Sequence, residues 1–144
     1  MAISNETLYI DVWTTLRNII VASAPFITNS VTASTSAASI YVAYNDRYPS
    51  RPQVIINPIQ KTESDYKFGT LTIGGKKTIN VVIDCFGDKS LYADQLIQAV
   101  DYALTSTSIP EIELVGSTSN GAFESINGGE KLFGQSMTFT YIEE

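Results

Sequence analysis

The chain has 144 residues, of which 44% are hydrophobic and 17% are charged, and this size and balance fit one folded domain spanning 1–144 better than two domains or a disordered chain. Its formal net charge of −6 disfavours binding to nucleic acid or to anionic membrane surfaces, because both need clustered cations. The chain has no histidine and a single cysteine, Cys85, which excludes the commonest general base, most zinc sites and an internal disulfide.

The N-terminal region predicts one amphipathic helix over residues 5–22. Its apolar stripe has helical spacing and consists of Leu8, Val12, Leu16, Ile19 and Ile20. Trp13 lies beside the stripe, which makes it a candidate for contact with another subunit, although a lone tryptophan more commonly packs in the core. Residues 28–39 are rich in Ser, Thr and Ala and lack a helical period, so they are predicted to form a loop or a loosely paired strand.

The middle of the chain predicts strands. Residues 40–44 and 53–59 are apolar runs joined by a turn that carries Arg47, Tyr48 and Arg51. These three side chains are candidates for contact with another subunit or with a partner protein.

A second pair of strands is predicted over residues 66–73 and 77–86, with Gly74 and Gly75 as the tight turn between them. The later strand alternates, and one of its faces is wholly apolar, with Ile79, Val81, Ile83 and Cys85.

A second amphipathic helix is predicted over residues 89–105, with Asp88 as its N-cap. Its buried stripe consists of Ala93, Leu96, Ile97, Val100, Ala103 and Leu104. The preceding run Gly87-Asp88-Lys89-Ser90 has too few glycines for a phosphate-binding loop, and Asp88 would repel the anion.

The C-terminal region predicts two strands, over residues 111–115 and 132–143, separated by a Gly- and Asn-rich loop or small hairpin at 116–131. The last strand places Met137, Phe139 and Tyr141 on one face. The order of elements predicts an α+β fold, in which a mainly antiparallel β-sheet has two amphipathic helices packed on one face.

Charge is distributed unevenly along the chain. Residues 1–46 have a net charge of −2, residues 47–79 of +4 and residues 80–144 of −8. The acidic part supplies a candidate acidic surface with Glu111, Glu113, Glu124 and Glu130. Basic and acidic segments could meet between subunits, or they could interleave within one fold so that the asymmetry averages out.

Two pairs of carboxylates, Glu111 with Glu113 and Asp84 with Asp88, have a spacing that could serve acid–base chemistry or a hard cation. They are more simply interpreted as solvated strand faces and helix caps. We therefore expect no enzyme, no cofactor and no metal, and a protein that acts through its contacts.

The segments INVVIDCFGDKSLYADQLIQAVDYAL, residues 79–104, and GQSMTFTYIEE, residues 134–144, resemble the tail terminator, or tail-completion, proteins of long-tailed bacterial and archaeal viruses. The resemblance implies a homo-oligomer, a six-subunit ring, that caps the tail tube, stops its polymerisation and joins the tail to the head and neck. It implies two partners, the tail tube protein and a neck or head-completion protein.

The same resemblance implies that DNA passes the lumen of the ring without specific binding and that no membrane is involved. It implies a location in the virion tail after assembly in the host cytoplasm. Two alternatives stay open: another neck or tube protein of the same virion, and a small soluble α+β binding module that recognises a peptide or ligand.

Overall fold

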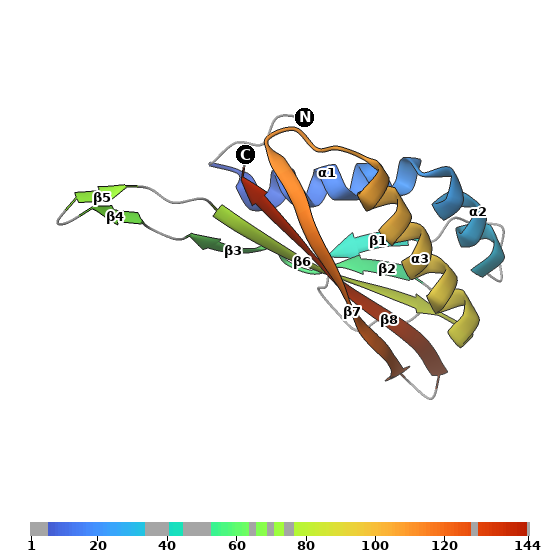
Figure 1. Cartoon of the computed structure of the whole chain (residues 1–144). Coiled ribbons are helices and arrows are strands. Elements are labelled where there is room, and N and C mark those ends of the chain that lie inside the picture. Colours follow the sequence, from blue (N-terminus) through green and yellow to red (C-terminus); the bar gives the residue numbers. More distant parts are fainter. Residues whose placement is uncertain are drawn as a thin grey trace.

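The computed structural model describes residues 6–33, 41–44, 53–63, 66–68, 71–73, 77–127 and 130–143. In these ranges, three helices and a mixed but mainly antiparallel sheet make an α+β fold, as the sequence predicts, and the helices cover one face of the sheet (Figure 1). The helices are α1 (Leu8–Ala22), α2 (Ala24–Ala33) and α3 (Ser90–Ser106). The strands are β1 (Tyr41–Tyr44), β2 (Gln53–Ile56), β3 (Gln60–Glu63), β4 (Tyr66–Phe68), β5 (Leu71–Ile73), β6 (Lys77–Gly87), β7 (Ile112–Asn127) and β8 (Glu130–Glu143).

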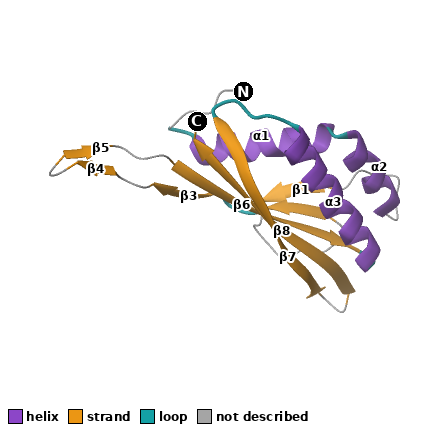
Figure 2. Ribbon diagram, viewed as in Figure 1, coloured by secondary structure: helices purple, strands orange, loops and turns teal. Residues whose placement is uncertain are grey.

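The main sheet has the strand order β1-β2-β6-β8-β7, and β3 pairs with the first part of β6. All pairings in this sheet are antiparallel except β1 with β2, which is parallel. The long strand β6 is therefore central, and β7 lies at one edge. The small strands β4 and β5 form a separate antiparallel pair that extends away from the helices and the main sheet (Figure 2).

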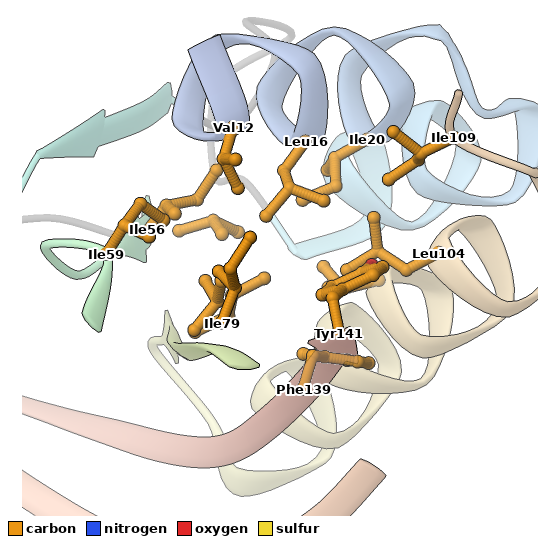
Figure 3. Packing of buried hydrophobic residues seen from close by; sticks show 14 of the residues in the cluster. Val12, Leu16, Ile20, Ile56, Ile59, Ile79, Leu104, Ile109, Phe139 and Tyr141 are labelled. Atoms are coloured by element: carbon orange, nitrogen blue, oxygen red, sulfur yellow. The ribbon is translucent and has the colours of Figure 1, made fainter. Parts of the chain in front are cut away.

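The core lies between the helices and one face of the sheet (Figure 3). The predicted stripes of α1 and α3 are the buried faces of these helices, with Ile19 of α1 packed at the margin of the core. From the sheet, Ile79, Val81, Ile83 and Cys85 of β6 and Phe139 and Tyr141 of β8 point into the same core. The alternation in β6 and β8 is confirmed, and Cys85 serves as a small buried hydrophobic residue.

A smaller apolar cluster lies on the opposite face of the sheet and consists of Ile55, Phe86 and Leu132. The ring of Phe123 in β7 packs edge to face against Phe86, with 5.3 Å between ring centroids. Phe123 is paired with Gly134 of β8, and a Cβ at Gly134 would lie only 2.5 Å from the tip of that ring. An aromatic ring thus covers a glycine on the neighbouring strand.

The prediction of a loop or strand over residues 28–39 is wrong for its first part, because α2 continues to Ala33. Ser23 separates the two helices, and its carbonyl accepts the Ile27 amide at 3.0 Å, which starts the new helix. Pro25 is tolerated in the first turn, where its missing N–H has no helical partner to lose. Phe26 is buried in the core and fixes the helix against it.

One predicted strand pairing and one predicted strand end differ from the structure. Residues 66–73 divide into β4 and β5, which pair with each other, so β6 pairs with β3 instead. The predicted turn at Gly74 and Gly75 lies outside the described residues. The predicted strand 53–59 ends at Ile56, since Pro58 lacks the N–H that a continuing ladder would need.

Of the two alternatives predicted over 116–131, a loop or a small hairpin, the hairpin is observed, but it is long, because β7 continues to Asn127 and pairs with β8 along its length. Two register shifts, between Leu114 and Gly116 and between Ser119 and Gly121, accommodate the extra residues as bulges. The predicted N-cap at Asp88 is also wrong: Lys89 occupies that position and no side chain caps the helix. The Lys89 carbonyl accepts the amides of Tyr92 and Ala93.

Candidate interaction surfaces

Trp13 joins α1 to the sheet. It is half-buried, packs against the core, and its indole Nε1 donates a hydrogen bond to the Ile56 carbonyl at 3.0 Å. This places the ring at the border between the core and the surface. Its predicted contact with another subunit stays a prediction.

The other predicted contact residues, Arg47, Tyr48 and Arg51, lie outside the described residues. Their role in assembly therefore rests on the sequence.

The four glutamates predicted as an acidic surface are divided between the two ends of β7. Glu111 and Glu113 are exposed at its start, and Glu111 has a φ of 75°, a strained conformation for a residue with a side chain. Glu124 lies eleven residues further along, roughly 35 Å for an extended strand, and pairs with Lys131 at 3.0 Å. Glu130 begins β8 opposite Asn127. The structure does not bring these residues together in one cluster.

Asp84, one of the carboxylates considered for acid–base chemistry or cation binding, has a structural hydrogen bond. It accepts from the Asn57 amide Nδ2 at 2.9 Å, and this contact holds the chain where it leaves β2. Within the described ranges, no group of three metal-ligating side chains comes together. No helix among the described residues has the length and apolar character to cross a bilayer.

A pocket with a volume of about 410 Å³ lies between the C-terminal parts of α1 and α3. Small polar and aliphatic side chains such as Thr15, Asn18 and Ala22 line it, and Tyr102 is its one aromatic residue. It does not have the aromatic lining that a peptide- or ligand-binding module would favour.

The face of the sheet away from the helices is polar across its centre and includes the Asp84 carboxylate, which lies opposite Ser136. Asn120 of β7 donates to Ser136 and Thr138 of β8, at 3.2 and 2.9 Å, and Thr140 donates to Asn80 of β6 at 2.9 Å. Hydroxyl and amide groups thus link three strands. The register assigns no Lys or Arg of β6, β7 or β8 to this face.

The outer edge of β7 is a further surface, and the sequence did not reveal it. β7 is a 16-residue strand at the edge of the main sheet. Between Glu113 and Glu124 it has no charged residue and no proline, and the side chains at 115–120 are exposed. The lack of charge over this run was the available signal, but its Gly, Ser and Asn residues indicated a loop.

Comparison with solved structures finds the fold in a chain of the virion of a native gene transfer agent (GTA) particle. The TM-score is 0.54 at 16% sequence identity, and the match covers 92% of this chain and 94% of that chain. The similarity therefore extends over nearly the whole of both chains and shows a shared fold. No protein-family profile matches the sequence, and no curated protein matches it significantly.

Proposed function

We propose that this protein is a structural component of a phage-like virion and, more specifically, a tail terminator. The observation that carries the proposal is the fold shared with a chain of the gene transfer agent virion over 92% of this chain. The resemblance of residues 79–104 and 134–144 to tail terminator proteins narrows the proposed location within the virion to the end of the tail tube. In this role, copies of the chain form a six-subunit ring that caps the tube and stops its growth. The ring then connects the tail to the neck and head.

The charges of the described surface support such a role. A ring through which DNA moves needs a surface that does not hold phosphates, and phosphate binding depends on Lys and Arg. The hydroxyl and amide face of β6, β7 and β8 has neither, which would suit DNA passing without specific binding. Arg47 and Arg51 belong to the basic segment 47–79, and we propose that they contact an acidic surface of a neighbouring subunit.

The test uses purified tail tubes that lack a terminator. Electron microscopy of tubes incubated with the protein should show extra density at one end only, and these tubes should no longer elongate when tube protein is added. Decoration along the tube wall would indicate a tube protein instead. Binding to isolated heads but not to tubes would indicate a neck protein, and binding to neither would contradict a role at this junction.

A further inference from the structure

The hairpin of β4 and β5, called the arm, has few contacts with the other described elements of its own subunit. It is a separate two-stranded sheet, and its main contacts are between its own two strands. Figure 1 shows it extending beyond the end of β3, away from the helices. A two-stranded hairpin is at best marginally stable in water. The arm would therefore gain stability by packing on another surface.

The edge of β7 is such a surface. Backbone groups on the outer side of an edge strand have no partner strand, and proteins usually protect long edges with Lys, Pro, β-bulges or a covering segment. The run from Glu113 to Glu124 lacks Lys and Pro. Its two bulges leave Gly116–Ser119 as a regular four-residue stretch, which matches the three-residue strands of the arm in length.

The two elements have opposite charge. Residues 60–77, which contain the arm and its base, have four lysines and two acidic residues, a net charge of +2. Residues 111–127 have three glutamates and no cation, a net charge of −3, although Glu124 is paired with Lys131 of β8. Association of these segments is therefore favoured electrostatically as well as by strand pairing.

An arm cannot easily reach the β7 edge of its own subunit, because β8 lies between β6 and β7 in the sheet and the arm continues outward from β6. We propose that the arm of one copy pairs with the 116–119 stretch of β7 in a second copy of this chain. The contact is head to tail, because each subunit offers an arm at one end and a free edge elsewhere. It supplies the subunit contact of the proposed ring and in that respect rests on the proposed function.

Crosslinking through introduced thiols tests the contact. Cys85 is fully buried, and burial, together with the neighbouring Asp84 carboxylate, raises the pKa of its thiol, so it will not compete for a thiol reagent. With a flexible bis-maleimide at high protein concentration, a Thr72→Cys/Thr118→Cys double variant should give trimers and larger species. Each single variant should give dimers at most. A matched control pairs Thr72→Cys with Gln98→Cys, an exposed position on α3.

A mixing experiment tests the head-to-tail direction. One variant has residues 64–76 replaced by an Asn-Gly turn and carries Thr118→Cys, so it keeps a free edge but has no arm. The other has Ser117→Lys and Ser119→Lys on its edge and carries Thr72→Cys, so it keeps an arm. Their mixture should give a crosslinked one-to-one heterodimer and no larger species. A ladder equal to that of the Gln98 control, or no heterodimer, would overturn the contact.

The two proposals can fail separately. If the wild-type protein caps tail tubes but the Thr72/Thr118 pair does not crosslink, in solution or on capped tubes, the arm contact is wrong and the terminator role stands. If the crosslinks form but no tube is capped, the contact stands as a self-association surface of a protein with another role.

Discussion

Substitution of Gly134 tests the packing on the outer face of the sheet. In a Gly134→Ala variant, the new methyl group would meet three ring atoms of Phe123 at 2.5, 2.8 and 2.9 Å, whereas ordinary contacts begin at 3.4 Å. The ring must therefore move by about an ångström. Because Phe123 packs edge to face on Phe86, this movement disturbs a favourable aromatic contact.

The expected change in the free energy of unfolding is the difference between two opposing contributions. Loss of the edge-to-face contact costs about 0.5–1.5 kcal/mol, and strain in the displaced ring adds to it. Replacing glycine by alanine in a strand returns about 0.5–1 kcal/mol. We expect a net destabilisation of about 1 kcal/mol, a decrease in melting temperature of about 3 °C.

A double-mutant cycle tests whether the Phe123 ring causes this destabilisation, because the effect of Gly134→Ala should change sign when the ring is removed. In a Phe123→Ala background the obstructing ring is absent, so Gly134→Ala should stabilise the fold by about 0.5 kcal/mol instead of destabilising it. Urea unfolding followed by circular dichroism would measure all four proteins. If Gly134→Ala had the same effect with and without the Phe123 ring, the ring would not be packed over the glycine as described.

Three further predictions concern the helices and β8. Val100 is fully buried, so Val100→Asp should lower the free energy of unfolding by about 3 kcal/mol or more. The control Gln98→Asp, on the exposed side of the same helix, should change it by less than about 0.5 kcal/mol. Equal melting temperatures of the two variants would show that the assigned buried face of α3 is wrong. Trp13→Phe should lower the free energy of unfolding by about 1–2 kcal/mol, because it removes the donor to the Ile56 carbonyl. Calorimetry would measure this change, because the variant has no tryptophan whose fluorescence could be followed. Tyr141→Phe should be neutral within about 0.5 kcal/mol at pH 7, because the buried hydroxyl lacks a hydrogen-bond partner among the described residues. Burial also raises the pKa of Tyr141 above its ordinary value, so this tyrosine ionises first in the unfolded state as pH rises through about 10. Above that pH the wild type should lose stability that Tyr141→Phe retains. Equal alkaline unfolding curves of the two proteins would contradict this.

The elements with strong periodicity could be predicted from the sequence. The stripe of α3 and the alternation in β6 and β8 were correct because their apolar residues repeat at the helical or strand period over many positions. Local patterns of this kind depend on which face is buried. They do not depend on which strand lies next to which.

The errors occurred where tertiary contacts override local preference. Residues 116–127 have the Gly, Ser and Asn content of a loop, yet they form β7 because β8 supplies a continuous partner. The break between β4 and β5 was missed because Gly69 and Thr70 were included in one longer strand. The uncharged run of β7 did not by itself indicate a free edge, since edge position follows from the strand order and not from composition.

The central position of β6 has a consequence for synthesis on the ribosome. Its partner on one side, β8, follows much later in the chain, and the pairing of Thr78 with Ile142 spans more than sixty residues. Until residues 130–143 emerge, the nascent chain must hold α1, α3 and β6 together without Phe139 and Tyr141 in the core. We expect folding to be completed only after β8 has been translated, with β6 exposed to chaperones or to neighbouring nascent chains during that interval.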